Sequence, residues 1–519
     1  MSSDLVLSID CGTQSLRAIL FDSNGNLISA HKEEYPQAYI SPKPGWAEQP
    51  LEVYERSLAI ACRSLREKVQ KLWNEIRAVC VTTQRDTCVF LDEKGRPLRN
   101  AIVWLDQRMA RYDVRLPWFY KIGFKIVGMD KAAKISAKKC KYNWVKQNEP
   151  EIWRKTHKFL LLSGWLNYLL TGKFVDSIAN QIGHIPFNYK KLSWASSPLD
   201  YHRMLFPVEE SKLVELVQPT SVISGVRKEA SNLTGILEGT PVIAAGSDKG
   251  CETIGLGCLE PSRACVSLGT TVTVQITSDR YLEPIKFMPS YPAVIPGKYN
   301  PEVEIFRGFW MVSWFKKEFA NYEIKLAEQK GVSVEEIFDE LLKCTEPGCL
   351  GLMLQPYWGA ALKMPEARGA ILGFGDIHNK AYLYRSIIEG LAYAAREGVE
   401  KIEKVSKVPI KEVVVSGGGS RSDFVCQIFA DVLNRRLYRG ENYEGSGLGA
   451  AMAGFVGLGV YKTFEEAAQC MVRYSRCFEP NQKRSELYEQ LYTRVYKKIY
   501  PKLKPLYVEL QKITRYPER

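Results

Sequence analysis

The sequence predicts an α/β protein built from two related domains. Short segments rich in Val, Ile, Leu and Phe at 4–9, 17–22, 78–82 and 88–92 are bounded by turn signals, a pattern typical of β-strands. Residues 50–74 between them have the apolar spacing of a helix. The layout of the first strand pair returns in the second half of the chain, which indicates a second, similar domain.

The first of these strands ends in a polar turn. In LVLSIDCGTQSLR (5–17) an apolar run leads into Asp10, Gly12 and Thr13. A strand that turns through Gly-Thr exposes successive backbone N–H groups in a concavity that binds anions, phosphate above all. Asp10 would add the hard oxygen ligand that the Mg²⁺ of ATP prefers. Taken alone, the turn is equally explained by an aspartate that caps it.

The end of the first half carries a second isolated aspartate. Residues 140–235 are expected to be mostly helical, and TPVIAAG (240–246) is expected to be a strand. Asp248 follows this strand, near the junction of the two halves. An aspartate there suits a general base that accepts a hydroxyl proton, and the alternative is a helix cap. Lys249 would keep this carboxylate ionised if both side chains point the same way.

The second half opens with the repeat of the first turn. Ser267 to Thr270 stand where the first half has Asp10 to Thr13. Two such turns on facing domains would hold a polyphosphate between them. Further along we expect helices at 331–343 and 381–406, a strand at 411–419, a helix from about 422, a closely packed segment at 445–454 and a helical, peripheral tail after about 460.

A third glycine-rich element is VVVSGGGSRSDFVCQIFADVL (413–433). Gly417 to Gly419 leave room for a flat or charged ligand, and the N-terminus of the helix behind them favours anions. Ser422 alternatively caps that helix. The sequence contains neither GxxxxGKS/T nor a GxGxxG after a strand, so it indicates neither a P-loop nor a dinucleotide-binding fold.

Length and composition fit a globular protein of two or three domains. Of the 519 residues, 45% are hydrophobic and 25% are charged, which supports sizeable cores. No apolar run reaches the roughly 18 residues that span a bilayer, and the start of the chain lacks the features of a signal peptide. Thirteen cysteines without a CxxC pair favour reduced thiols over disulfides or zinc ligands. We therefore expect a cytoplasmic protein.

The net charge of +13 is spread along the chain, which does not favour a nucleic-acid partner. Much of the excess lies in KAAKISAKKCK (131–141) and RVYKKIYPKLKP (494–505). We expect each of these stretches to form the solvated face of a helix, and we expect no membrane partner. The sequence is compatible with a homodimer and does not determine the oligomeric state.

The chain resembles the FGGY family of carbohydrate kinases, within the sugar kinase, actin and heat-shock ATPase superfamily. The resemblance runs from Leu5 to about Gly459, and its motifs are highly specific in their order and spacing. Its carriers are LSIDCGTQSLRAILFD (7–22), PGWAEQP (44–50), VTTQRDTCVFLDEKGRPL (81–98), VWLDQR (103–108), GSDKGCETIGLG (246–257), SLGTTVTV (267–274), RGAILGFGDIHNKAYLYRSIIEGLAY (368–393) and VVVSGGGSRSDFVCQIFADVL (413–433).

The resemblance implies two ribonuclease-H-like domains, 1–255 and 256–519, that close on a cleft for ATP and a sugar. It implies that the γ-phosphoryl group passes to a hydroxyl of a small sugar or polyol, with Asp248 as the base and Mg²⁺ organised by Asp10. The first phosphate loop would then comprise Gly12, Thr13 and Gln14, the second Gly269, Thr270 and Thr271, and the adenosine site Gly418, Gly419 and Ser422. Phosphoryl transfer needs chiefly positioning, charge neutralisation and one proton acceptor, which these residue types supply.

The sugar-binding side is predicted from TTQRDT (82–87), which resembles the glycerol kinase branch. Gln84, Arg85 and Asp86 are therefore the substrate candidates, and an exposed surface pair is the alternative for Arg85 and Asp86. Lys249 joins them because it replaces a glutamine of that branch.

Several residues depart from the glycerol kinase pattern. Asp86 replaces a longer glutamate, and Lys134 stands in the approximate place of a tyrosine. Phe309 and Trp310 occupy positions where glycine and alanine are common. Together they favour a differently shaped pocket, for a ketose, a longer polyol or an acidic sugar.

Two other functions fit the same superfamily. One is a nucleotide-dependent switch or chaperone-like ATPase, which would have no use for Asp248 or the Arg85–Asp86 pair. The other is a sugar-binding regulator that has lost catalysis, which the presence of both Asp10 and Asp248 disfavours. The sequence thus favours an ATP-dependent kinase of a small sugar or polyol.

Overall fold

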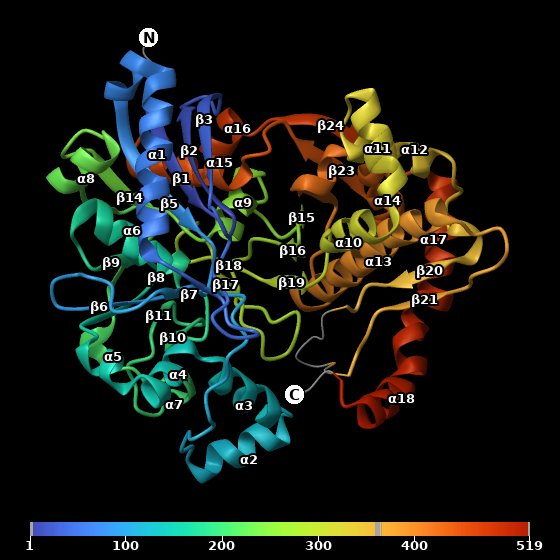
Figure 1. Ribbon diagram of the computed structural model, residues 1–519, viewed down its shortest axis with the longest axis horizontal. Coiled ribbons are helices and arrows are strands. Elements are labelled where there is room, and N and C mark those ends of the chain that lie inside the picture. Colours follow the sequence, from blue (N-terminus) through green and yellow to red (C-terminus); the bar gives the residue numbers. More distant parts are fainter. Residues whose placement is uncertain (1–3, 359–363, 365, 517–519) are drawn as a thin grey trace.

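Two six-stranded sheets form the two halves of the molecule (Figure 1). The structure is a computed structural model that describes residues 4–358, 364 and 366–516. In spatial order the first sheet consists of β3 (Leu27–Glu34), β2 (Ser15–Asp22), β1 (Leu5–Cys11), β5 (Ile76–Thr83), β14 (Pro241–Ala244) and β13 (Val222–Gly225). The second consists of β19 (Glu302–Ile305), β16 (Val272–Gln275), β15 (Arg263–Leu268), β22 (Glu412–Ser416), β23 (Arg436–Gly440) and β24 (Tyr474–Phe478).

The two sheets have the same sequence of parallel and antiparallel pairings. From the β3 or β19 edge inward, the first two pairings are antiparallel, the next two are parallel, and the last is antiparallel. The repeat that the sequence predicts from two turns therefore extends over five strands of each sheet, from β3 to β14 and from β19 to β23. The division at residue 255 stays a prediction.

Strand β1 lies in the middle of the first sheet and is buried along its whole length. Its nearly continuous apolar sequence is typical of a strand covered on both faces. Because β1 runs parallel to β5, with Cys11 opposite Thr83, the carboxyl ends of both strands lie at one edge of the sheet. This edge brings the turn after β1 close to the residues that follow Thr83.

Eighteen α-helices occur among the described residues. Those of the first half are α1 (Leu51–Val69), α2 (Trp118–Ile126), α3 (Asp130–Lys139), α4 (Lys141–Asn148), α5 (Pro150–Lys155), α6 (Leu162–Thr171), α7 (Tyr201–Leu205), α8 (Lys228–Thr234) and α9 (Asp248–Gly255). Those of the second half are α10 (Trp310–Phe319), α11 (Asn321–Lys330), α12 (Val334–Lys343), α13 (Lys380–Ser406), α14 (Asp423–Leu433), α15 (Gly445–Gly457), α16 (Phe464–Met471), α17 (Gln482–Leu491) and α18 (Lys497–Thr514). Helices α1 and α6 share a core with the first sheet, and α13 and α14 share one with the second.

Two predicted regions differ from the sequence expectation. Residues 140–235 are not mostly helical, because short strands separate their helices: β8 (Lys158–Leu161), β9 (Val175–Ser177), β10 (Phe187–Asn188), β11 (Ser193–Trp194), β12 (Glu215–Val217) and β13. Of these, β8 joins β4 (Glu48–Gln49), β7 (Ala101–Ile102) and β6 (Cys88–Leu91) in a four-stranded sheet. Strands this short carry too few alternating residues to reveal a period of two.

The tail after residue 460 is also not peripheral. Strand β24 forms an edge of the second sheet, and Tyr488, Tyr492 and Tyr496 are buried in the core beneath α13. Their spacing of four residues places them on one face of the helical segment that follows. The tail therefore completes the second domain.

Helix α15 crosses the boundary between the halves. It follows β23 in the second half but packs against β1 and β5 of the first sheet, and it crosses α9 in near backbone contact. A Cβ at Gly449 would lie 1.9 Å from the carbonyl oxygen of Cys251, and one at Gly255 would lie 2.1 Å from that of Gly445. The close approach predicted for 445–454 is thus confirmed.

We expect Gly449→Ala to destabilise the protein by about 1–3 kcal/mol, because the new methyl group forces two backbones apart. The midpoint of thermal unfolding measures this loss. Gly123→Ala is the matched control, since Gly123 is also helical and an added Cβ there meets no atom within 4 Å. Equal midpoints for Gly449→Ala and the wild-type protein would contradict the close contact.

The described residues include no helix that is long and apolar enough to cross a membrane. Cys251, Cys258 and Cys265 are buried free thiols, as their apolar surroundings predict. These three cysteines thus serve as small apolar side chains in the core.

Candidate active site

The first predicted phosphate loop is the hairpin turn between β1 and β2. The backbone N–H of Gly12 donates to the carbonyl of Ser15 at 3.0 Å, which closes the turn. The Thr13 hydroxyl donates to Oε1 of Gln84 at 2.7 Å and accepts from the Trp104 indole N–H at 3.0 Å. Gln84 is buried and also donates to the Tyr54 hydroxyl at 3.2 Å. Gln84 therefore fixes the loop to β5, a structural contact that adds to its predicted role toward substrate.

The second predicted loop is the turn between β15 and β16. The carbonyls of Gly269 and Thr270 accept hydrogen bonds from the backbone N–H groups of Phe309 and Trp310 at 2.9 and 3.3 Å. Gly417 adopts a left-handed φ of +82° and packs directly behind the same turn, because a Cβ there would lie 2.8 Å from the carbonyl carbon of Leu268. Two of the predicted glycine-rich elements thus lie in contact.

In the third glycine-rich element, residues 417–419, the glycines differ in how much space surrounds them. A Cβ at Gly418 would meet no atom within 4 Å, whereas one at Gly419 would lie 2.4 Å from the Phe309 ring. Gly418 therefore offers exposed backbone to a ligand, and Gly419 is required for packing. Ser422 caps α14 by accepting from the Val425 N–H at 3.1 Å, and its hydroxyl donates to Asp339. The capping alternative thus holds for Ser422.

Asp10 lies at the end of β1 beside the first loop. Burial raises the pKa of Asp10 to about 7, while Arg17, whose Nη1 is 3.4 Å from Oδ2, opposes the rise. Asp248 raises the pKa of Asp10 further, so the two carboxyls share one electrostatic environment. The described residues hold no cluster of three or more potential metal ligands. One carboxylate next to a phosphate loop nevertheless fits Mg²⁺, which takes few protein ligands when phosphates supply the rest.

Asp248 is the first residue of α9. Ser247 caps this helix and accepts from the Gly250 N–H at 3.3 Å, so the capping role belongs to Ser247. An Asp248 oxygen accepts from the backbone N–H of Lys249 at 2.8 Å and lies 3.9 Å from Nε of Arg85. The Asp248 side chain is 28% exposed, which leaves the carboxylate accessible to a substrate hydroxyl. Burial raises the pKa of Asp248, and Lys249 and Arg85 limit that rise.

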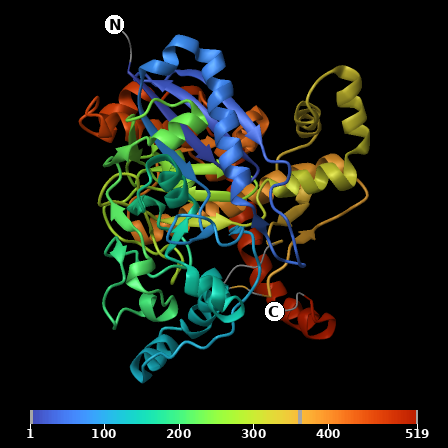
Figure 2. The ribbon, with the colours of Figure 1, turned by 60° about the vertical axis from the view of Figure 1, so that its left-hand side comes forward.

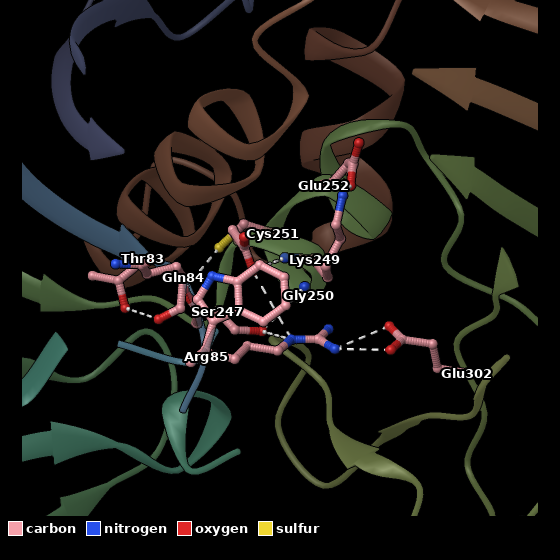
Figure 3. Close-up of polar contacts among 12 residues, drawn as sticks. Thr83, Gln84, Arg85, Ser247, Lys249, Gly250, Cys251, Glu252 and Glu302 are labelled. Atoms are coloured by element: carbon pink, nitrogen blue, oxygen red, sulfur yellow. Dashed lines mark hydrogen bonds and ion pairs between the residues drawn. The ribbon is translucent and has the colours of Figure 1, made fainter. Parts of the chain in front are cut away.

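Lys249 points away from the Asp248 carboxylate. Its Nζ donates to Oε2 of Glu252 and to the Ser267 hydroxyl, both at 2.7 Å (Figure 3). Glu252 also accepts from Ser267 at 3.0 Å and from Ser416, at the ends of β15 and β22. Burial disfavours ionisation of Glu252, but Lys249 and the two serines outweigh it and lower its pKa. The Lys249 side chain therefore connects α9 to the second sheet, while its charge and the backbone N–H of Lys249 both lower the pKa of Asp248.

Arg85 crosses from the first half to the second. Its Nη1 donates to both carboxylate oxygens of Glu302, each at 3.0 Å, and its Nε donates to the Ser247 hydroxyl at 3.3 Å (Figure 3). The guanidinium lies 4.8 Å from the centre of the Tyr291 ring. Its Nη2 is buried without a hydrogen-bond partner, which is costly unless a ligand accepts from it. Arg85 is therefore not part of an exposed surface pair.

Asp86 is likewise not part of an exposed surface pair, because it contacts two other side chains. Oδ2 lies 2.6 Å from Nζ of Lys141 and 3.2 Å from Nδ1 of His184. Burial favours the neutral carboxyl, but Lys141 and His184 outweigh it and hold the pKa of Asp86 well below its usual range. The backbone of Asp86 has a left-handed φ of +49°, a strained conformation that is common at functional sites.

Lys134 lies outside the described site, whereas two glutamates that no sequence motif indicated lie within it. Lys134 is exposed on α3 and pairs with Asp130 at 2.9 Å, so it does not reach the described site. Glu302 and Glu304 were missed, although glutamates at alternate positions of one strand lie on one face. Burial and the charge of Glu302 raise the pKa of Glu304 to about 7. The structure thus adds two acidic side chains of β19, Glu302 and Glu304, to the predicted substrate site.

The chain matches the models of the N-terminal domain (residues 5–255) and the C-terminal domain (residues 264–458) of the FGGY family of carbohydrate kinases. Two curated relatives align along almost the whole chain. The xylulose kinase of Lactococcus lactis is 26% identical over 492 residues, which cover 93% of this chain and 94% of that protein. The glycerol kinase of Thermococcus kodakarensis is 31% identical over 502 residues, covering 93% of this chain and 95% of that protein.

Solved structures with the same architecture include two enzymes from Lactobacillus acidophilus. Its gluconate kinase superposes with a TM-score of 0.82 at 21% identity, covering 98% of this chain and 100% of that chain. Its xylulose kinase gives a TM-score of 0.79 at 22% identity, covering 99% of each chain. These likenesses show the two-domain α/β fold of the actin-like ATPase type that the sequence predicts.

Proposed function

Because this chain belongs to the FGGY family of carbohydrate kinases, we propose that it transfers the γ-phosphoryl group of ATP to a hydroxyl of a small sugar or polyol. The observation that carries the proposal is the position of Asp248. Its accessible carboxylate begins α9 beside Arg85 and within electrostatic reach of Asp10. A proton acceptor, an anchored cationic side chain and two glycine-rich turns supply what phosphoryl transfer requires.

In the proposed reaction, Asp248 accepts the proton of the substrate hydroxyl as its oxygen attacks the γ-phosphorus. The bond between that phosphorus and the β,γ-bridging oxygen breaks, which leaves ADP and the phosphorylated sugar. Backbone N–H groups of the turns at 12–14 and 269–271 hold the phosphates, and Gly418 lies where the adenosine approaches. Asp10 would hold Mg²⁺, directly or through water, and the metal would neutralise phosphate charge.

The substrate side is proposed to centre on Arg85. Its buried, unpartnered Nη2 donates to a hydroxyl or carbonyl oxygen of the sugar, while Glu302 and Ser247 keep the guanidinium in place. Asp86, which Lys141 holds in place, accepts a hydrogen bond from a further hydroxyl of the sugar. Relatives named xylulose, glycerol and autoinducer-2 kinases indicate the range of acceptors to consider.

A screen for ADP release tests the proposal. Purified full-length protein with Mg-ATP is assayed over trioses, polyols, ketopentoses, sugar acids and small hydroxyketones. We expect one class of acceptor to raise ADP release far above the rate without acceptor. Equal ATP hydrolysis with and without every acceptor would instead favour a nucleotide-dependent switch.

We also expect a pH dependence of kcat/KM that reports Asp248. Because burial raises the pKa of Asp248, a protonated and inactive form accumulates at a higher pH than for an ordinary carboxyl. Activity should therefore fall on acidification with a midpoint above about 4, the usual aspartate value. An acidic limb at or below that value would contradict the role or the environment assigned to Asp248.

A further inference from the structure

Helix α2 carries an exposed apolar face. Trp118, Ile122 and Ile126 follow one another at intervals of four residues and are 73%, 50% and 78% exposed. Phe119 adjoins them and is also exposed. These four side chains occupy a single arc of the helix, so they form one apolar stripe, which we call the α2 stripe.

The α2 stripe is separate from the face that holds the helix to the protein. Phe124 is buried and packs edge-on against Tyr201 at 5.7 Å, and Tyr120 lies 5.7 Å from Phe124. The helix is therefore anchored through its inner face. Apolar side chains on its outer face gain nothing from the fold of this chain, and contiguous exposed apolar patches mark interaction sites.

Exposed basic side chains lie on α2 and in the segments on either side of it. The segment 111–141 has nine Lys and Arg residues against two Asp, and all of the basic residues except Lys141 are exposed. Lys121 and Lys125 lie on α2 itself, next to Trp118 and Ile122 along the helix. The stretch 131–141 that the sequence analysis assigned to a solvated face is thus the neighbour of an apolar stripe.

Figures 1 and 2 show that α2 and α3 project from the lower end of the molecule, away from both sheets. The C-terminal helix α18 lies toward the same end in both views. It also exposes apolar residues on one face, Leu506, Leu510 and Ile513, and most of the second basic stretch lies in its first half. Both basic stretches noted in the sequence therefore lie on the lower side of the molecule in Figure 1, the first mainly in α3 beneath the first half and the second mainly in α18 beneath the second half.

We propose that this end docks on an anionic membrane surface, with the α2 stripe inserted among the lipid headgroups. An exposed helix with Trp, Phe and Ile on one side and lysines beside them is typical of interfacial helices. Lysines near an anionic leaflet add electrostatic attraction. A second copy of the chain is a poorer partner, because it would bring the same lysines against each other. The docking is independent of the proposed kinase activity and revises the expectation of no membrane partner.

Vesicle flotation with the full-length protein tests this docking. One vesicle type is phosphatidylcholine alone, and the other contains equal parts of phosphatidylcholine and phosphatidylglycerol. We expect flotation with the anionic vesicles only, and weaker binding as salt is raised. Lys121→Ala combined with Lys125→Ala should weaken binding about 30-fold. Ile122→Ser combined with Ile126→Ser should weaken it at least about 10-fold.

Ile377→Ser is the matched control, since Ile377 is 61% exposed but lies outside the α2 stripe. It should bind like the wild-type protein, and unchanged thermal unfolding midpoints should show that every variant is folded. The proposal is overturned by failure to float with anionic vesicles, by equal binding to neutral ones, or by unchanged binding of the Ile122 and Ile126 variant. A wild-type dimer that this variant dissociates would assign the stripe to a second copy and also overturn it.

Discussion

Replacing Asp248 with asparagine is expected to lower kcat by about 10²- to 10⁴-fold, the usual contribution of a general base. Asparagine has the same shape but cannot accept the hydroxyl proton. The Asp248 carboxylate makes one hydrogen bond to its own helix, from the Lys249 N–H, and an amide oxygen can replace it. The fold should therefore persist, and the effect should fall on kcat rather than on nucleotide binding.

The measurement combines steady-state kinetics on the acceptor found by the ADP screen with calorimetric titration of Mg-ATP. Asp130→Asn makes the same chemical change on α3, where Asp130 pairs only with exposed Lys134 among the contacts described. That control should keep wild-type activity. Full activity of Asp248→Asn would remove Asp248 from the mechanism, and loss of Mg-ATP binding would show that it acts on the nucleotide instead.

Lys141→Met is expected to destabilise the protein by about 3 kcal/mol, because it leaves the half-buried Asp86 carboxylate without its main cationic partner. Nζ of Lys141 lies 2.6 Å from that carboxylate, and Lys141 is itself buried. Methionine keeps the length and the apolar stem of lysine, so the loss reports the charge. Chemical denaturation of both proteins measures it.

Lys134→Met is the matched control, because solvent screens its exposed ion pair with Asp130 and leaves that pair little effect on stability. Since the pKa of Asp86 is lowered in the folded protein, its stabilising contribution is present above the unfolded pKa and is lost as pH falls below it. The difference between Lys141→Met and the wild-type protein should shrink on acidification. Equal losses for the two lysine variants would contradict the buried pair.

The parts of the site that the sequence predicts best are those made locally. The turns at Gly12 and Gly269 each need only a strand end, a glycine and a threonine, all adjacent in the chain. Asp248 is likewise found because it directly follows an apolar strand. Local chemistry of this kind can be recognised before the fold is known.

The rest of the site is made by contacts between distant segments. Glu302 faces Arg85 across the two halves, 217 residues apart in sequence, and no local pattern announces that pairing. The contact of Lys141 with Asp86, 55 residues apart in sequence, could not be predicted for a related reason. The chain leaves helical geometry at Cys140, so α4 restarts in a new direction and turns Lys141 inward.

The sequence of the tail contains a periodic pattern of apolar residues that predicts a buried helix face. Tyr488, Tyr492 and Tyr496 are spaced as one helix face, and burial of that face was predictable. The lysines and arginines on either side of them, such as Lys483, Arg484, Lys497 and Lys498, gave the segment a polar average. Periodicity, not mean composition, decides whether a charged helix belongs to a core.

The shared topology of the two sheets also bears on how the chain arose. Five strands follow the same order in both halves, but the sixth does not, because β13 precedes its neighbour β14 in the chain whereas β24 follows its neighbour β23. A single duplication copies chain order along with structure. The five-stranded unit is therefore the segment that one duplication can explain. The sixth strand lies at different places in chain order, because β13 lies inside the first unit, between β5 and β14, whereas β24 follows the last strand of the second.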